Sequence, residues 1–367
     1  MVPWRMRRGQ LSVVLRALRE GRAGWLARQS WKYMRLKAAL RRGQTAPVCG
    51  PLMGALIITN RCNLRCAMCD LYERIEKPEL SADQWRRVID EMAAIGTSGI
   101  GISGGEALLH PQCNEFIARI RGHGLPATLN TNALLLADQG RAEAVVKADP
   151  TNVNISIDGA TAATHDKIRG REGALEMALQ GMRNLAAEAR RAGSGMTITA
   201  VTVVNRQNKG EVADIARLAA ANGAQQIGFM PSHNVDLAHQ RCVVAADPEM
   251  VGISKAVFAA IDQVPEIRLE NSTDYVRDFD LAYAGKEFPL PCNAGHTSLM
   301  VDSGGRVYPC WTYFEIGRAI PGANINQGGG LREIWQSAEY AAMRAETARC
   351  RMCYWNCQAE LNYLVRG

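Results

Sequence analysis

The chain has 367 residues, 47% of them hydrophobic, and a net charge of +7, which suits one large α/β domain with a smaller module. No uninterrupted apolar stretch reaches the ~20 residues of a membrane span. The arginine-rich first residues lack the apolar segment of a secretory signal. Eleven cysteines, mostly clustered and without an export signal, indicate a reducing compartment. The sequence therefore predicts a cytoplasmic protein without disulfides.

The positive charge is concentrated in residues 1–42, which contain twelve Lys or Arg and one acidic residue, Glu20. That segment carries +11, so the remaining chain carries −4, which argues against nucleic acid as a partner. Apolar residues recur at helical spacing from Leu11 to Leu18 and from Leu26 to Leu40, and this predicts one or two basic helices. Two interpretations are open. The arm either packs on the protein with a solvated basic face, or contacts an anionic membrane or an acidic partner.

From about residue 52, short apolar runs alternate with amphipathic helices. The runs are rich in β-branched residues, as is typical of strands covered on both faces. Ser81 and Gln84 form the capping-box pattern that opens one intervening helix. Six consecutive βα units predict a parallel sheet with right-handed crossovers, although periodicity alone does not separate a barrel from a doubly wound sheet. The predicted strands are Ala55–Thr59, Gly99–Ser103, Ala127–Asn130, Asn152–Ile157, Thr197–Val204 and Gln226–Met230.

Three cysteines with CxxxCxxC spacing, Cys62, Cys66 and Cys69, follow the first predicted strand. Thiolates are the usual ligands of iron–sulfur clusters, and a four-iron cluster normally takes four of them. Three thiolates on one loop would leave one iron open, as a catalytic zinc site leaves a position open. The alternatives are plain loop cysteines or part of a zinc site, which usually has shorter CxxC pairs and a fourth ligand. The spacing resembles the signature of the radical SAM superfamily, although Met68 stands where that family often has an aromatic residue.

This resemblance implies a partial (β/α)6 TIM barrel and a [4Fe-4S] cluster that binds S-adenosylmethionine. It implies reductive cleavage to a 5′-deoxyadenosyl radical, hydrogen-atom abstraction from a peptide or small molecule, and an electron donor such as flavodoxin or ferredoxin. The alternatives are an iron–sulfur electron carrier or scaffold without turnover, a zinc-bearing binding module, and an enzyme acting on a membrane lipid or lipid-linked substrate. The predicted division is a basic helical arm (1–50), a barrel core (51–245), a helical connector (246–290) and a cysteine-rich module (291–367).

Polar residues at the ends of the predicted strands supply the expected S-adenosylmethionine contacts. Gly104, Gly105 and Glu106 resemble the family's GGE motif, which binds the amino group. Two glycines let a backbone approach a ligand closely, and a carboxylate suits an ammonium group. These positions are also compatible with ordinary turns and helix caps. The resemblance further implies contacts from Asn132, from Ser156 and Asp158 to the ribose, and from Arg169 to the carboxylate.

A second set of cysteines lies near the end of the chain: Cys292, Cys310, Cys350, Cys353 and Cys357. Five thiolates suffice for one all-cysteine four-iron cluster but not for two. Their order, with Gly305 five positions before Cys310, resembles the SPASM or twitch extensions that hold auxiliary clusters. The expected ligands of one auxiliary [4Fe-4S] cluster are Cys292, Cys310, Cys350 and Cys353, with Cys357 as the substitute. A zinc knuckle would use the same ligands. The isolated residues Cys49, Cys113 and Cys242 receive no role.

Overall fold

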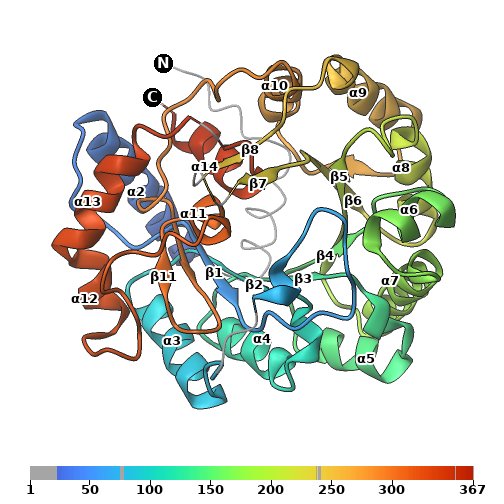
Figure 1. Cartoon of the computed structure of the whole chain (residues 1–367). Helices are drawn as coiled ribbons and strands as arrows, with labels where there is room; N and C mark the ends of the chain where they lie inside the picture. The colour runs from blue at the N-terminus through green and yellow to red at the C-terminus, as the bar shows by residue number, and fades with distance from the viewer. Residues whose placement is uncertain (1–22, 75–77, 237, 239–240, 352, 367) are drawn as a thin grey trace.

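The structure is a computed structural model that describes residues 23–74, 78–236, 238, 241–351 and 353–366. Figure 1 shows a curved sheet enclosed by a ring of helices. The six predicted strands are confirmed within one or two residues at each end. The strands of the large sheet are β1 (Met53–Ile57), β2 (Ile100–Ser103), β3 (Ala127–Thr131), β4 (Asn152–Ser156), β5 (Thr197–Val204), β6 (Gln226–Pro231), β9 (Arg268–Leu269), β10 (Ser298–Val301) and β11 (Val307–Tyr308).

These strands follow the order β11-β10-β1-β2-β3-β4-β5-β6-β9. All neighbours pair in parallel except β10 and β11, which are antiparallel. A small hairpin, β7 (Asn234–Asp236) with β8 (Arg241–Val243), follows β6. The strand order and the ring of helices establish the partial TIM barrel and exclude the doubly wound alternative.

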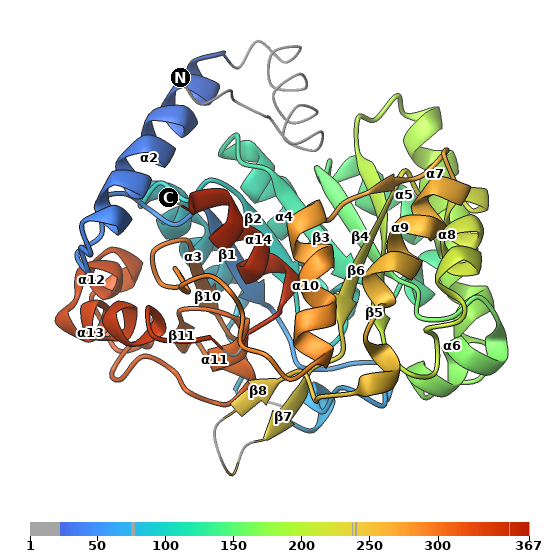
Figure 2. The same ribbon diagram turned by 90° about the horizontal axis from the view of Figure 1, so that it is seen from above.

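Helices cover the outer face of this sheet, and three of them gather along one side. Figure 2 shows α2 (Ala23–Arg41) running along that side, with α12 (Gly330–Gln336) and α13 (Ala338–Thr347) below it. Short 3₁₀ turns span Leu71–Glu73, Ala107–Leu109, Leu134–Ala137 and Pro248–Met250. The α-helices are α2 (Ala23–Arg41), α3 (Ala82–Ala94), α4 (Cys113–Gly122), α5 (Gln139–Lys147), α6 (Ala162–Arg169), α7 (Ala174–Arg191), α8 (Val212–Ala221), α9 (Ile253–Gln263), α10 (Thr273–Tyr283), α11 (Trp311–Glu315), α12 (Gly330–Gln336), α13 (Ala338–Thr347) and α14 (Asn356–Val365).

Alternation along the strands gives the sheet one apolar face and one polar face. Leu129, Val153 and Ile155 are fully buried in the hydrophobic core. The residues between them point to the opposite face, because successive side chains of a strand alternate. There Asn154 Nδ2 donates to Asn130 Oδ1 at 2.9 Å. Polar side chains on the inner face leave the barrel interior suited to a polar ligand rather than to a packed apolar core.

Local sequence signals explain how α3 begins and how the basic arm packs against the body of the protein. The capping box at Ser81 is confirmed, with the hydroxyl accepting from Gln84 N and the Gln84 side chain accepting from Ser81 N. In α2, Leu36 is buried and Lys32 Nζ donates to Pro51 O at 2.8 Å. One face of the arm therefore packs on the body. The expected helix from Leu11 to Leu18 lies outside the described residues.

The cysteine-rich end of the chain is built onto the barrel sheet. Strand β10 pairs in parallel with β1, in the register Met53↔Ser298, and β9 pairs with β6 at the other edge. Helix α14 contacts both α2 and α10. The predicted boundary near residue 291, between the helical connector and the cysteine-rich module, therefore does not separate two sheets, because strands from both sides of it belong to the same one. Within the part of the chain that the structure describes, no helix is both long and apolar enough to span a bilayer.

Candidate active site

The loop after β1 carries Cys62, Cys66 and Cys69 at the carboxyl edge of the sheet, where parallel barrels place their active sites. Cys62 and Cys66 are partly buried, whereas Cys69 is exposed. Leu64 N donates to Cys62 Sγ at 3.4 Å, and Cys69 N donates to Cys66 O at 3.1 Å. These local bonds fold the loop back on itself, so that the three thiols belong to one compact turn.

The two glycines of the GGE motif hold this loop against the end of β2. Gly105 N donates to Thr59 O, and Glu106 N donates to Arg61 O, both at 2.8 Å. A Cβ on Gly104 would lie 2.2 Å from Thr59 O, and one on Gly105 would lie 2.4 Å from Arg61 O. Gly104 also has φ of +149°. The close approach that glycine permits is therefore made to the chain's own backbone, directly before Cys62.

Glu106 and Asn132 link the ends of β2 and β3 to the same loop. The buried Glu106 carboxylate accepts from Thr131 Oγ1 at 2.7 Å, Asn132 N at 2.8 Å and Leu108 N at 3.1 Å. Burial raises the pKa of this carboxyl group, and these hydrogen bonds offset only part of that rise. Asn132 Nδ2 donates to Asn63 Oδ1 at 2.7 Å. A carboxylate has about four acceptor positions, so Glu106 retains capacity for one ammonium donor.

Asp158 and Arg169 form a buried ion pair beside the cysteine loop. Arg169 Nη2 lies 2.7 Å from Asp158 Oδ2, and Nη1 donates to Cys66 Sγ at 3.8 Å. Asp158 has no exposed surface, and its Oδ1 accepts from Val203 N at 2.8 Å. Asp158 thus orients Arg169, and the ribose contact predicted for Asp158 would require this pair to open.

Two further observations bear on the predicted S-adenosylmethionine contacts. Arg169 Nε is buried and has no hydrogen-bond partner among the described residues. An unsatisfied buried donor fits a site that receives a polar ligand, here the carboxylate expected for Arg169. Ser156 ends β4 in register with Val201, partly exposed. The structure therefore brings Glu106, Asn132 and Arg169 to the cysteine loop. Ser156 stays at the end of β4, the strand next to β3.

The five C-terminal cysteines come together from four separate segments. Cys292 precedes β10, Cys310 lies between β11 and α11, Cys350 and Cys353 join α13 to α14, and Cys357 lies on α14. Burial raises the pKa of the Cys310 thiol, and its neighbours Cys292, Cys350 and Cys357 raise it further. Burial likewise raises the pKa of the Cys353 thiol, and the neighbouring Cys310 and Cys292 raise it further. The sequence-distant cysteines are therefore neighbours in space, a donor set whose chemistry fits an iron–sulfur cluster.

Comparisons with known proteins identify the family. The family model of the radical SAM superfamily matches residues 56–219, and that of the SPASM iron–sulfur cluster-binding domain matches residues 292–358. The mycofactocin maturase MftC of Mycobacterium ulcerans is 30% identical over 313 residues, which cover 83% of this chain and 78% of that protein. The chain belongs to the radical SAM superfamily.

Other relatives of this radical SAM enzyme differ in what their names describe. The AdoMet-dependent heme synthase of Methanosarcina barkeri is 30% identical, over 79% of this chain and 83% of that protein. The crystal structure of Streptococcus suis SuiB bound to the precursor peptide SuiA has a TM-score of 0.64 at 15% identity, over 91% of this chain and 80% of that one. That structure shows a shared fold. Membership confirms the expected cofactors, S-adenosylmethionine, its [4Fe-4S] cluster and an auxiliary iron–sulfur site. Among the described residues, no three His, Cys, Asp or Glu side chains are arranged to hold a single metal ion.

Cys242 lies beside the auxiliary cysteines of this radical SAM enzyme, although the sequence assigned it no role. Its Sγ accepts from Trp355 Nε1 at 3.3 Å, and the indole of Trp355 stacks on His233 at 4.5 Å. Burial raises the pKa of the Cys242 thiol to about 12, and the nearby Cys350 contributes to that rise. Cys242 and Trp355 are 113 residues apart in sequence, so no motif spacing could have revealed this contact.

An arginine bridge joins the two cysteine regions. Arg74 Nη2 donates to Asp70 Oδ2 at 2.7 Å, next to Cys69, and Arg74 Nη1 donates to Glu315 O at 2.8 Å. The Glu315 carboxylate in turn accepts from Trp311 Nε1 at 2.7 Å, next to Cys310. A chain of hydrogen bonds therefore connects the radical SAM loop to the auxiliary module.

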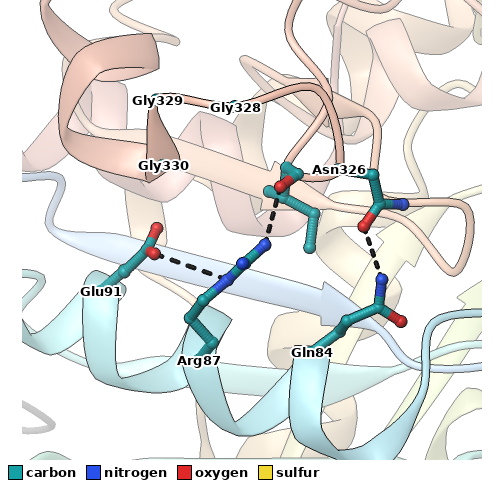
Figure 3. A pocket seen from close by; sticks show the side chains of 8 residues that line it. Gln84, Arg87, Glu91, Asn326, Gly328, Gly329 and Gly330 are labelled. Carbon is teal, nitrogen blue, oxygen red and sulfur yellow. Dashed lines mark hydrogen bonds and ion pairs between the residues drawn. The ribbon is translucent and has the colours of Figure 1, made fainter.

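A pocket of about 380 Å³ lies away from both cysteine sites, between α3 and the glycine-rich loop before α12. Figure 3 shows that its polar groups face one another. Arg87 Nη2 donates to Ile325 O at 2.7 Å, and Glu91 Oε2 accepts from Leu331 N at 2.6 Å. Because these groups satisfy one another, the pocket marks the junction of the barrel with the C-terminal module. None of the predicted site residues lines it.

Proposed function

We propose that this radical SAM enzyme modifies a peptide. The observation that carries its radical chemistry is the attachment of the three-cysteine loop to the Gly104–Gly105 backbone, with Glu106, Asn132 and Arg169 around it. The SuiB structure, which has a precursor peptide bound, supports a peptide substrate, and the name of MftC describes a maturase. The heme synthase is a relative of similar identity, and it makes a small-molecule substrate the alternative.

We assign residues to the cofactors on the basis of this geometry. Cys62, Cys66 and Cys69 would hold the cluster, Glu106 the ammonium group of S-adenosylmethionine, and Arg169 its carboxylate. When bound, these cofactors supply one-electron reductive cleavage and hydrogen-atom abstraction. The electron donor we propose is a flavodoxin or ferredoxin, as the resemblance to the radical SAM superfamily implies.

The chain's own residues position these groups. The Asp158 carboxylate fixes the Arg169 guanidinium by a 2.7 Å ion pair, so that one charged donor points at the loop before any ligand binds. Hydrogen bonds from Thr131 and Asn132 hold the Glu106 carboxylate in the same way. Preorganisation of this kind reduces the reorganisation needed on binding.

The test of the radical site replaces Cys62, Cys66 and Cys69 together by Ala. The triple variant should lose about four irons per chain and form no 5′-deoxyadenosine from S-adenosylmethionine and dithionite. Its far-ultraviolet circular dichroism should match the wild type, because the loop contributes little to the barrel core. Undiminished 5′-deoxyadenosine in a folded triple variant would end this assignment.

The peptide proposal has its own test. Short peptides encoded next to the gene would be incubated with the reconstituted enzyme, S-adenosylmethionine and reductant. A change in peptide mass that requires S-adenosylmethionine and is lost in the triple variant supports it. Consumption of a tetrapyrrole or another small molecule, with every peptide unchanged, would favour the alternative substrate class.

We also propose that the basic arm, residues 1–42, binds an anionic partner and takes no part in the chemistry. Helix α2 lies on the outside of the barrel (Figure 2), and it carries none of the residues assigned to the site. The sequence left a membrane and an acidic partner open, and charge alone does not separate them.

A further inference from the structure

The outward face of α2 combines exposed apolar side chains with arginines. Trp31 is 63% exposed and Met34 is 57% exposed, and only Val251 joins them among the exposed large hydrophobic residues that the structure describes. The two are three positions apart, so they lie on the same side of the helix. The guanidinium of Arg35 stands 4.5 Å from the centre of the Trp31 ring.

This face differs from the apolar stripe that the sequence analysis emphasised. Leu36 and Ala39 are buried against the body, and Tyr33 Oη donates to Leu364 O at 2.8 Å. The helix thus uses its expected apolar stripe for packing. Trp31 and Met34 lie outside that stripe, and this packing gives no reason for two large apolar side chains to be in water.

The charged side chains of α2 and of the residue that follows it are all of one sign. Residues 23–42 contain six Lys or Arg and no acidic residue. Lys32 is turned into the body, whereas Arg28, Arg35, Arg41 and Arg42 are exposed. None of these four forms an ion pair with a residue that the structure describes. The face therefore presents an uncompensated positive field with an aromatic centre.

We infer that this face, formed by Arg28, Trp31, Met34, Arg35 and Arg41, docks on an anionic lipid bilayer. The inference rests on the proposed role of the basic arm. A helix with basic residues around exposed Trp and Met side chains matches an interfacial membrane helix, because the apolar groups enter the headgroup boundary while arginines meet anionic headgroups.

Two other occupants fit this face less well. An acidic peptide is usually held in a groove or along a sheet edge. This face belongs to a single helix, and α2 lines neither the pocket beside α3 nor the smaller pocket at residues 47–50 of the described chain. A second copy of the chain would bring the same arginines together, and like charges at close range oppose such an interface. A planar anionic surface requires neither a groove nor a complementary fold.

The experiment uses the full chain and sedimentation with phosphatidylcholine vesicles, either pure or with about one-quarter phosphatidylglycerol. The wild type should bind the anionic vesicles and dissociate as salt is raised. The variant Trp31→Ser/Met34→Ser should bind at least ~10-fold more weakly, and Arg28→Gln/Arg35→Gln should lose much of its salt dependence. Val251→Ser, which removes an equally exposed apolar side chain elsewhere, is the matched control and should bind as the wild type.

Three results would overturn the inference. These are unchanged vesicle binding by Trp31→Ser/Met34→Ser, equal binding to neutral vesicles, and loss of a wild-type dimer in that variant with no vesicle binding. The side chains are exposed, so all variants should fold, and circular dichroism checks this. Formation of 5′-deoxyadenosine should be the same in all of them. A failure of docking is thereby distinguished from a failure of the radical SAM site.

Discussion

Gly105→Ala should disturb the active site through the backbone alone. A methyl group there would lie 2.4 Å from Arg61 O and 2.6 Å from Asn60 O, whereas Cβ atoms essentially never approach within 3.0 Å. The two segments must therefore separate by about 0.6 Å, the difference between 3.0 and 2.4 Å. Overpacking of this kind costs ~1–3 kcal/mol, and weakening the two 2.8 Å hydrogen bonds costs up to ~1 kcal/mol each. We expect a loss of ~2–4 kcal/mol.

Urea unfolding of the unloaded protein measures this loss, and iron content with 5′-deoxyadenosine formation measures its effect on the site. Iron content and 5′-deoxyadenosine formation should fall together with stability, because the displaced segment runs directly into Cys62. The control is Gly122→Ala at the end of α4, where a methyl group meets nothing within 4 Å and helix propensity favours alanine by ~0.5–1 kcal/mol. If Gly105→Ala matched this control in stability and in iron content, the glycine argument would be refuted.

Three further predictions concern other parts of the molecule. Asp158→Asn should lower the free energy of unfolding in urea by ~3–5 kcal/mol, because it leaves a buried arginine without its counter-charge. Asp90→Asn, which breaks a half-exposed ion pair, should lower it by at most ~1 kcal/mol. Equal losses in the two variants would contradict this reasoning. Cys353→Ala should remove the auxiliary cluster and Cys357→Ala should leave it, as iron and sulfide analysis of each variant can show. Burial lowers the pKa of Lys32 from 10.5 to about 8, so the unfolded chain holds that proton more tightly. Wild-type stability relative to Lys32→Met should then rise between pH 8 and 10.5, by up to ~3 kcal/mol, and a flat difference would argue against it.

Most of the correct predictions of the fold and the site depended on local sequence patterns. The six barrel strands were found because each is a short β-branched run between helices, and the capping box at Ser81 depends only on residues three apart. The cysteine loop and the GGE motif were likewise recognisable within a few residues. Strands, helix caps and short motifs depend on residues that are close in the chain, and these can be read directly from the sequence.

Contacts between distant segments were not predictable. Strand β10 is four residues long and joins β1 from more than two hundred positions away, and periodicity gives no partner for so short a run. Cys242 and Glu315 acquire their positions beside the cysteine sites only through the tertiary fold. Asp158 was noticed in the sequence, but its orientation toward Arg169 depends on where the fold places the end of α6 relative to the end of β4.

The pairing of β10 with β1 has a consequence for how the protein is made. Until residue 301 has left the ribosome, β1 is an open edge strand that carries fully buried Leu56 and Ile57 and leads straight into the cysteine loop. Open edges of this kind recruit foreign strands. Truncation before residue 298 would therefore yield an aggregation-prone barrel rather than a minimal catalytic domain. The edge beside β1 is therefore covered only once β10 has been made, late in the synthesis of the chain.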